Sequence, residues 1–347
     1  MEFSDSPQVT DINDHNELKE KLGNRISVWI TAMSLGDTIC TTPTVRKLKE
    51  LYPDYKIDVY AYHPEIFTYN PHVDRVYNFK DQLSLSDYYT MLNKYGYTKY
   101  FIPYISSENK PKWDTFKTNL IDFCSLMALN QTLKDSEKWL EVPVSEKENK
   151  SLDEKLKELN INFEKAVVVH PSITWPSRTW PAVQWQELTR LLTRAGYQVI
   201  AVGKTVPHVA RKLENQSDKN MGMLPCPKGA VNLIDSLTVL ETVSLLRCSK
   251  FLITLDSGLL HLGFCTDINI IGMFTSVHPK FRQAWRNGSF EYKFTIVPPQ
   301  GKCCYCSYNS PNPLITSFGR CSFGDIAICL PTAKQVYNYF IEMMNRE

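Results

Sequence analysis

The sequence predicts an α/β protein with two parallel β-sheets, each covered by helices. Apolar runs of strand length alternate with amphipathic segments of helix length, and this alternation occurs in two series. A stretch rich in Glu, Lys and Asn separates the two series. Strands that alternate with helices pair in parallel, so each series predicts one doubly wound domain. The length of 347 residues agrees with two domains of about 150 residues each.

The first series occupies residues 25–150. It follows a polar lead-in at residues 1–24, where a short helix is expected at 15–22. The expected strands are 25–31, 57–61, 73–77 and 98–104. Gly36-Asp37 ends the first strand, and helices are expected at 38–52, closed by Pro53, and at 83–95. Together these elements predict the first domain.

A change of composition between Leu140 and Lys165 predicts the domain boundary. Val142-Pro143-Val144 is followed there by a run of Glu, Lys and Asn. Such a run also reads as a solvent-exposed helix, and both interpretations stay open at this point. We therefore expect a second domain at residues 151–330.

The second series begins with a strand at 166–170 and a helix at 180–194. That helix has Pro181 in its first turn and Gly196 just past its end, as helices prefer. Further strands are expected at 197–202, 231–234, 251–255 and 268–274, and further helices at 207–214, 238–248 and 258–265. A helix at 331–345 closes the chain, and we expect residues 331–347 to pack back on the N-terminal domain.

The charge and hydropathy of the chain exclude several classes. The formal net charge of +2 and the 43% hydrophobic content exclude a strongly basic coat protein and a polyanionic disordered chain. No run of 18 apolar residues and no signal peptide occurs, so we expect a cytoplasmic protein with free thiols and no transmembrane segment, although peripheral membrane contact stays open. The charge is uneven: residues 1–150 hold 18 Lys and Arg against 22 Asp and Glu, a net of −4, whereas residues 151–347 hold 21 against 15, a net of +6.

Several familiar motifs are absent or incomplete. Gly203-Lys204-Thr205 looks like the end of a phosphate-binding P-loop, but Gln198 stands where that motif needs its first glycine. The dinucleotide fingerprint, the nucleophile elbow and the Asp-x-Asp pair of metal-dependent sugar transferases are missing. These absences count against a kinase, a dehydrogenase, an α/β-hydrolase and a metal-dependent sugar transferase.

Three segments carry candidate site residues where a predicted strand ends, which is where parallel sheets bind ligands. In the first, Gly36 allows close approach of the backbone, and Asp37 is either a carboxylate at the crevice or a cap of the next helix. In the second, Arg178 is a candidate for binding phosphate, while Trp175, Trp180 and Trp185 either stack on a base or pack two elements together. The third segment contains Asp256, Ser257, Gly258 and His261, and the helix start within it predicts an anion site.

Half of the ten cysteines lie within one C-terminal segment. They are Cys303, Cys304, Cys306, Cys321 and Cys329. Four of them, Cys303, Cys306, Cys321 and Cys329, are a candidate set for a structural zinc ion. The alternative is a compact loop that contains reduced thiols.

In this order, the segments resemble glycosyltransferase family 9, the heptosyltransferase-like sugar transferases, over about residues 25–340. The shared pattern comprises Gly36-Asp37, Thr42-Pro43, Leu48 to Tyr52-Pro53, His170-Pro171, Trp175, Arg178, Trp180-Pro181, Asp256-Ser257-Gly258 and His261. The cysteines, with Leu330 after Cys329, are similar to a cysteine-bearing tail of some members.

The resemblance implies a GT-B fold, in which two Rossmann-like domains face each other across a cleft. It implies inverting transfer from a nucleotide-diphosphate sugar without a catalytic metal or other cofactor. Asp37 matches the general base, with Gly36 and Thr38 beside it on the acceptor side of the cleft. The residues expected to bind the donor are Ser172, Trp175, Arg178, Gly203, Asp256, Ser257, Gly258 and His261.

Two departures from the family bear on the sugar and on the acceptor. Arg178 stands where members often have lysine, and Pro207-His208 stands near the place of an acidic residue thought to touch the donor. The family's usual acceptor is a lipopolysaccharide-type or other surface saccharide. The composition, rich in Lys, Asn and Tyr, leaves open a phage-type enzyme of the host cytoplasm that modifies a hydroxymethylated DNA base. An alternative of another class is a catalytically inactive module that binds a sugar nucleotide.

Overall fold

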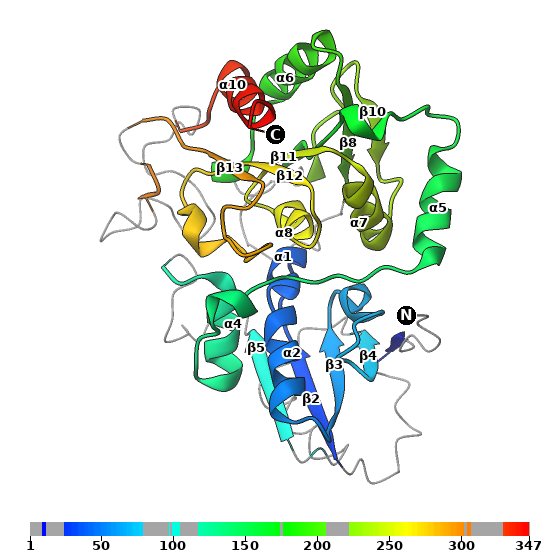
Figure 1. Ribbon diagram of the computed structural model, residues 1–347, viewed down its shortest axis with the longest axis vertical. Helices are drawn as coiled ribbons and strands as arrows, with labels where there is room; N and C mark the ends of the chain where they lie inside the picture. Colours follow the sequence, from blue (N-terminus) through cyan, green and yellow to red (C-terminus); the bar gives the residue numbers. More distant parts are fainter. Residues whose placement is uncertain are drawn as a thin grey trace, which may run out of the picture. The chain divides into compact units, whose positions relative to one another are not determined.

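The computed structural model describes residues 9–11, 24–78, 97, 99–104, 117–173, 176–205, 222–301, 304–306 and 329–346. The chain divides into two compact units (Figure 1). The first unit is Met1–Glu146 with Ala284–Gly288, and the second is Lys147–Gln283 with Ser289–Glu347. The first boundary falls close to the predicted one at 150/151, whereas the return of Ala284–Gly288 to the first unit was not predicted.

The first unit contains a parallel sheet with the strand order β1-β4-β3-β2-β5. Its strands are β1 (Val9–Asp11), β2 (Arg25–Ile30), β3 (Lys56–Ala61), β4 (Arg75–Asn78) and β5 (Lys99–Tyr104). The four strands β2 to β5 lie close to the predicted ranges. Strand β1 comes from the polar lead-in and pairs with β4, which the sequence pattern did not indicate.

The two faces of this sheet differ in chemistry because side chains alternate along a strand. One face carries aliphatic side chains such as Ile26 and Val59, both fully buried. On the other face, Trp29, Tyr60 and Tyr77 form a stack across three neighbouring strands, with ring centroids 4.0 Å and 4.6 Å apart. At these spacings, the flat rings bury a large area and hold the strands in register.

The helices of the first unit are α1 (Leu35–Ile39), α2 (Thr42–Leu51) and α4 (Leu120–Leu129), with 3-10 turns η2 (Pro64–Phe67) and η3 (Asp135–Glu137). The prediction of one helix at 38–52 is wrong, because Pro43 lies in the first turn of α2 and cannot donate a backbone hydrogen bond to α1. Helix α4 was not predicted; it starts at a side-chain cap from Asn119 and ends at the left-handed Asn130. The helix predicted at 83–95 lies outside the described residues.

The second unit contains a six-stranded parallel sheet with the order β10-β8-β6-β11-β12-β13. Its strands are β6 (Ala166–Val169), β8 (Gln198–Gly203), β10 (Val231–Ile234), β11 (Phe251–Leu255), β12 (Asn269–Met273) and β13 (Phe294–Val297). Counted along the chain, this order is 3-2-1-4-5-6, that of a Rossmann-type doubly wound sheet. Strand β13 was not predicted, and a separate antiparallel pair joins β7 (Ser172–Ile173) to β9 (Gly222–Met223).

Helices cover both faces of this sheet, with α6 (Ala182–Arg194) and α10 (Ala333–Met344) on one side and α7 (Val239–Cys248) and α8 (Gly258–Phe264) on the other (Figure 1). Helix α5 (Glu146–Leu156) buries only Leu152 and Leu156, so the predicted solvent-exposed helix is present. Short 3-10 turns occur at η4 (Phe163–Lys165), η5 (Pro176–Arg178) and η6 (Pro279–Phe281). The helix predicted at 207–214 lies outside the described residues.

The C-terminal helix α10 corrects one expectation. We expected it to pack on the N-terminal domain, but Val336, Phe340 and Met343 lie in the core of the second unit. Phe340 contacts Phe251 of β11, with ring centroids 4.8 Å apart. The apolar stripe of α10 therefore completes the hydrophobic layer that α6 begins on this face of the sheet.

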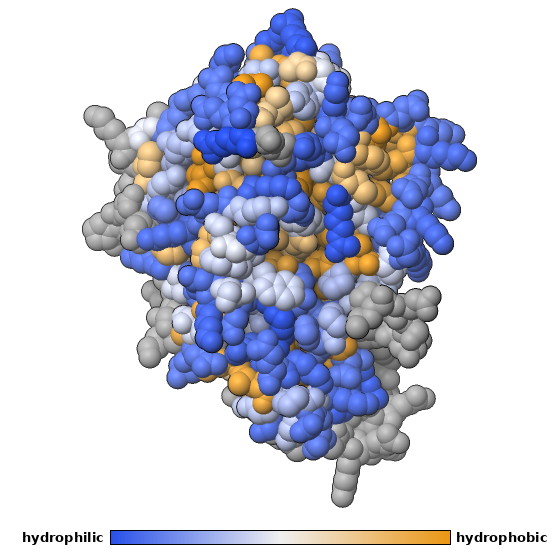
Figure 2. Space-filling model, viewed as in Figure 1, coloured by the Kyte–Doolittle hydropathy of each residue, from blue (hydrophilic) through white to orange (hydrophobic). Residues whose placement is uncertain are grey.

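The outer surface agrees with cores enclosed inside the units. Hydrophilic side chains cover most of the face shown in Figure 2, and hydrophobic side chains appear between them in separate areas. Among the described residues, no helix is long and apolar enough to cross a membrane.

Candidate active site

The topology of each sheet points to a crevice at its carboxyl edge. In a doubly wound sheet, ligands bind outside the carboxyl ends of the strands where the strand order reverses. In the second unit this point lies between β6 and β11, which are neighbours in the sheet. In the first unit it lies between β2 and β5. His170 directly follows β6, Asp256 directly follows β11, and the segment with Asp37 follows β2, so three of the candidate segments are at these points.

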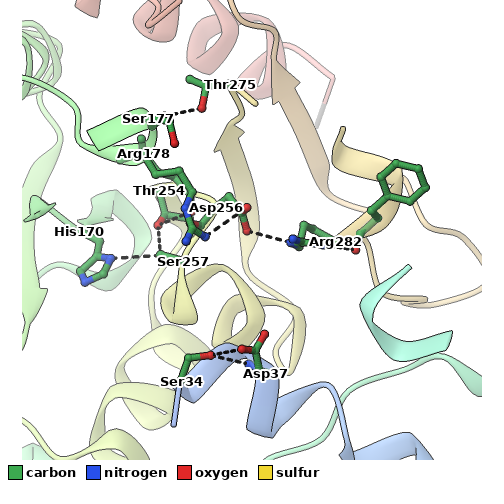
Figure 3. Close-up of polar contacts among 12 residues, drawn as sticks. Ser34, Asp37, His170, Ser177, Arg178, Thr254, Asp256, Ser257, Thr275 and Arg282 are labelled. Atoms are coloured by element: carbon green, nitrogen blue, oxygen red, sulfur yellow. Dashed lines mark hydrogen bonds and ion pairs between the residues drawn. The ribbon is translucent and has the colours of Figure 1, made fainter. Parts of the chain in front are cut away.

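Asp256 is the centre of the polar cluster in the second unit (Figure 3). Asp256 is only 3% exposed to solvent. One carboxylate oxygen, Oδ2, lies 3.3 Å from Nη1 of Arg178, and the other, Oδ1, lies 3.4 Å from Nε of Arg282. Nη1 of Arg178 also donates to the backbone oxygen of Asp256 at 3.0 Å. The sequence prediction included Asp256 and Arg178 but missed Arg282.

The protonation states in this cluster follow from burial and charge. Burial opposes ionisation of Asp256, but the guanidinium groups of Arg282 and Arg178 outweigh it and lower the pKa of this carboxyl. Burial lowers the pKa of His261 to about 4, although the nearby Asp256 opposes this shift. At neutral pH the cluster therefore contains one carboxylate, two guanidinium groups and a neutral imidazole.

A chain of hydrogen bonds links β6 to β11 beside this cluster. Nδ1 of His170 lies 3.2 Å from Oγ of Ser257, which lies 3.2 Å from Oγ1 of Thr254. Since Thr254 donates its proton to the carbonyl of Leu255 at 3.2 Å, Ser257 donates to Thr254 and accepts from Nδ1–H of His170. Burial lowers the pKa of His170 to about 4, so this imidazole is neutral as well. The sequence motif contained His170, but we did not count it among the site residues.

Ser257 does not cap the helix that it precedes. It occupies the N-cap position of α8, yet its side chain makes no capping hydrogen bond. Its hydroxyl is engaged with Thr254 and His170 instead, and Gly258 is the first residue of the helix. His261 lies in the same short helix and is 3% exposed, so its side chain is enclosed near Asp256 rather than presented to solvent.

Gly203 ends β8 beside His170. Its φ of +144° lies in the region that side chains rarely adopt, and a Cβ there would lie 2.5 Å from Sδ of Met223 and 3.0 Å from Cδ2 of His170. The glycine therefore allows the imidazole and the thioether to pack against the backbone. Ser172 is 3% exposed in β7, and its hydroxyl has no hydrogen-bond partner among the described residues.

The loop with Arg178 is anchored to a second loop. Arg178 ends the turn η5, and the carbonyl of the preceding Ser177 accepts a hydrogen bond from Oγ1 of Thr275, which follows β12 (Figure 3). The same β12 loop continues to η6 and Arg282. The two arginines thus come from loops that are joined independently of Asp256.

Two of the three tryptophans of this segment lie in the hydrophobic core. Trp180 and Trp185 are 0% and 1% exposed and pack edge to face, with centroids 4.7 Å apart. Nε1 of Trp180 also donates to the carbonyl of Pro331 at 2.7 Å. Both rings are therefore parts of the core rather than platforms for a base. Trp175 lies outside the described residues.

In the first unit, Asp37 occupies the first turn of α1, where Ser34 rather than Asp37 is the N-cap. The hydroxyl of Ser34 donates to Oδ2 of Asp37 at 2.5 Å and accepts from the backbone N–H of Asp37 at 3.3 Å (Figure 3). Asp37 is half-buried, and its negative charge adds to the effect of burial in raising the pKa of the Cys124 thiol on α4. The carboxylate is oriented by Ser34 and remains partly accessible.

The neighbours of Asp37 stabilise this turn. Thr38 is fully buried, and its hydroxyl donates toward the backbone oxygens of Ser34 at 3.1 Å and Ala32 at 3.4 Å. Gly36 is buried, and its carbonyl accepts a hydrogen bond from Cys40. Both residues therefore support the loop that carries Asp37.

The candidate metal ligands are only partly within the described residues. Cys306 is buried and Cys329 half-buried, whereas Cys303 and Cys321 lie outside the described residues. The backbone N–H of Gln300 donates to the carbonyl of Cys329 at 2.9 Å, so these two residues lie next to each other. In the part of the chain that the structure describes, no group of three or more His, Cys, Asp or Glu could hold a metal ion.

Comparison with known families decides the class of this protein. The sequence model described as "Glycosyltransferase family 9 (heptosyltransferase)" matches residues 72–293, which is more than half of the chain. The chain belongs to glycosyltransferase family 9. This match confirms the predicted family and the predicted enzyme class, a glycosyltransferase.

Solved structures with low sequence identity share the fold of this glycosyltransferase. A family 9 glycosyltransferase from Veillonella parvula is 15% identical, with a TM-score of 0.65 and coverage of 93% of this chain and 98% of that one. The ADP-heptose LPS heptosyltransferase II of E. coli is 16% identical, with a TM-score of 0.62 and coverage of 92% and 98%. TibC of enterotoxigenic E. coli, an iron-containing dodecameric glycosyltransferase, is 16% identical, with a TM-score of 0.61 and coverage of 94% and 78%.

These similarities confirm the α/β prediction with two parallel sheets of the GT-B type. A search of curated protein sequences finds no match to this chain.

Proposed function

We propose that this glycosyltransferase moves a sugar from a nucleoside-diphosphate donor, bound by the second unit, to an acceptor hydroxyl that Asp37 deprotonates. The observation that carries the proposal is the pair of arginines around Asp256 at the strand-order reversal of a Rossmann-type sheet. Guanidinium groups at this place suit a diphosphate, because they form charge-assisted hydrogen bonds to phosphate oxygens. The net charge of +6 on residues 151–347 attracts an anionic donor to the same half of the chain.

The donor side uses neutral and cationic groups together. Arg178 is the more exposed of the two arginines, so we assign it to the diphosphate. Ser257, Gly258 and the neutral His170 line the edge next to it, and Gly203 leaves room for the His170 ring. Ser172, Trp175 and His261 stay in the proposed donor set, His261 through its electrostatic interaction with Asp256.

The proposed reaction is a single in-line displacement. The Asp37 carboxylate takes the proton of the acceptor hydroxyl while the hydroxyl oxygen attacks the anomeric carbon of the sugar. The bond between that carbon and the phosphate oxygen breaks, and the nucleoside diphosphate leaves with the bonding electrons. Arg178 and the hydrogen-bond donors beside it stabilise the developing charge without a metal ion. Attack opposite the leaving group inverts the anomeric configuration.

Similar proteins indicate which donor to test first. One solved structure of TibC is a complex with ADP-heptose, and the E. coli neighbour is an ADP-heptose LPS heptosyltransferase. We therefore propose ADP-heptose as the first donor and a lipopolysaccharide-type or other surface saccharide as the acceptor, with the reaction in the cytoplasm. The arginine at position 178, where lysine is frequent, keeps other nucleotide sugars in the comparison.

We also propose a structural metal ion held by Cys303, Cys306, Cys321 and Cys329. The backbone hydrogen bond from Gln300 to Cys329 supports this proposal, because it holds Cys329 next to a residue that precedes Cys306 by only six positions. Zinc suits four thiolates, and iron is the second metal to test because TibC contains iron. The metal would stabilise the loop and takes no part in the transfer step.

The proposed function is tested by a binding panel followed by a transfer assay. ADP-heptose and common UDP-, GDP- and CDP-sugars are screened for thermal stabilisation, and the bound donor is incubated with saccharide acceptors and, separately, with hydroxymethylated DNA. We expect Asp37→Asn to bind the donor normally and to lose transfer by about 100-fold or more. Asp54→Asn, which changes an exposed aspartate after α2, is the matched control.

Each outcome of this assay has a clear meaning. Transfer by Asp37→Asn at the wild-type rate would refute the assignment of the base. Transfer to DNA alone would replace the saccharide acceptor. Donor binding without any transfer or donor hydrolysis would indicate an inactive binding module. Absence of binding to every nucleotide sugar would refute the proposed donor site.

A further inference from the structure

Asp256 holds its carboxylate between two guanidinium groups that differ in exposure. The side chain of Arg178 on Oδ2 is 21% exposed, whereas that of Arg282 on Oδ1 is 9% exposed. Figure 3 shows the two arginines approaching Asp256 from opposite sides. Arg178 is therefore the cation that can meet a ligand, and Arg282 is the one enclosed in the protein.

The position of Arg282 is fixed by contacts of its own. It follows η6, its backbone N–H donates to the carbonyl of Pro279 at 2.8 Å, and its Nη1 donates to the carbonyl of Phe281 at 3.0 Å. These bonds orient the guanidinium so that Nε faces Oδ1 of Asp256. If Asp256 turned both of its oxygens toward Arg178, it would lose its ion pair with Arg282.

The charges of these side chains add up to a net positive charge. Asp256 contributes one negative charge, Arg178 and Arg282 contribute two positive charges, and the enclosed His261 is neutral because burial lowers its pKa to about 4. The group therefore carries a net charge of +1. If Arg282 were absent, Asp256 and Arg178 would neutralise each other, and the net charge would be zero.

We propose that Arg282 is a positioning residue that keeps Arg178 competent to bind the diphosphate of the donor, by holding one oxygen of Asp256 and compensating its charge. The inference rests on the proposed function, because it takes a diphosphate as the ligand of Arg178. It goes further by giving a role to a residue that the family pattern in the sequence did not single out.

Joining the two loops is not enough to explain why Arg282 pairs with Asp256. The loop with Arg178 and the loop with Arg282 are already joined by the hydrogen bond from Thr275 to Ser177. Moreover, a carboxylate as enclosed as Asp256 would need only one guanidinium to form an ion pair. The second guanidinium supplies the excess charge that a diphosphate can use.

The test measures binding of inorganic pyrophosphate and of ADP by calorimetry. Pyrophosphate has no sugar or base, so it reports on the phosphate site alone. We expect Arg282→Met to weaken pyrophosphate binding by about tenfold or more, because Asp256 then neutralises Arg178 and weakens its charge-assisted bonds to phosphate. The double variant Asp256→Asn/Arg282→Met also removes the carboxylate that would neutralise Arg178. We therefore expect its affinity for pyrophosphate to return to within about threefold of the wild type. Arg190→Met changes an arginine of α6 whose side chain is 39% exposed and pairs with Glu187, and this variant should bind like the wild type.

The double variant also separates positioning from folding, because it contains no unpaired buried carboxylate. Rescue by the second substitution supports the proposal, since a purely structural arginine would make the double variant weaker still. Wild-type binding by Arg282→Met, or a folded double variant that binds no better than Arg282→Met, would overturn it. If Arg282→Met does not fold, weak binding by the folded double variant overturns it equally. If the wild-type protein binds neither pyrophosphate nor any nucleoside diphosphate, the donor site itself is refuted.

Discussion

Nδ1 of His170 lies 3.2 Å from Oγ of Ser257, and this contact joins the two strands at which the order of the second sheet reverses. His170 follows β6 and Ser257 lies two residues beyond β11. The two residues are far apart in the sequence, yet the topology makes them neighbours at the carboxyl edge. Two further donor-side residues are Gly203, which ends β8, and Arg178, which follows β7 and pairs with Asp256 after β11.

The first prediction concerns Arg178. Replacement by alanine should raise the donor dissociation constant by about tenfold or more, because a charge-assisted hydrogen bond to phosphate is lost. Arg178→Lys keeps the charge but loses the planar fork, so we expect an intermediate affinity. Calorimetric titration with the donor measures both, and Arg190→Ala serves as the control. Equal donor affinity of Arg178→Ala and the wild type would contradict the assignment.

The second prediction compares two glycines with positive φ. Gly196 (φ +85°) has open space around its missing Cβ, whereas Gly203 (φ +144°) has Met223 at 2.5 Å. Gly196→Ala should therefore cost about 1 kcal/mol in the free energy of unfolding, from backbone strain alone. Gly203→Ala should cost about 1–3 kcal/mol and also weaken donor binding, because the new methyl group displaces Met223 and His170.

Chemical denaturation of both glycine variants checks this comparison, and Gly203→Ala/Met223→Ala should recover part of the loss. The explanation by crowding would be wrong if the two single variants lost the same stability.

The third prediction concerns pH. His261 has a pKa of about 4 in the folded protein, below its unfolded value of about 6.5, so the unfolded chain binds the proton more readily. The contribution of His261 to the free energy of unfolding should therefore be fully present above pH 6.5. It should fall by about 3 kcal/mol as the pH drops toward 4. The lowered pKa of Asp256 adds a further loss at still lower pH. Urea unfolding between pH 7.5 and 5 should show a flatter slope for His261→Asn than for the wild type; parallel slopes would contradict the prediction.

The fourth prediction concerns the cysteine loop. Purified protein should contain about one zinc or iron ion per chain, bound by four thiolates. Cys306→Ser and Cys329→Ser should each lower the metal content and the thermal stability, because they remove ligands that close the loop. Cys248→Ser, which changes an exposed cysteine of α7, is the control. Elemental analysis checks the prediction, and a metal-free wild-type protein of unchanged stability would refute it.

The sequence predicted most strands of both sheets, because buried strands of a parallel sheet are continuous apolar runs. It also singled out Asp37, Arg178 and Asp256, since each stands just after such a run or its loop, and their role in a site stays a prediction. It missed β1, whose polar residues are ordered by pairing with β4. It missed Arg282 because an arginine in an irregular loop has no periodicity, and only the approach of its Nε to Asp256 marks it.

By itself, the sequence determined the fold class, the two series of strands and helices, and the family, because local hydropathy and short motifs carry that information. Only the tertiary structure decided which charged side chains form ion pairs, which tryptophans lie in the core, and where α10 packs. Burial sets these outcomes: Trp180 and Trp185 are enclosed by α10 and its neighbours, and two arginines distant in the chain are drawn to one buried carboxylate. Such long-range desolvation has no signature in the local sequence.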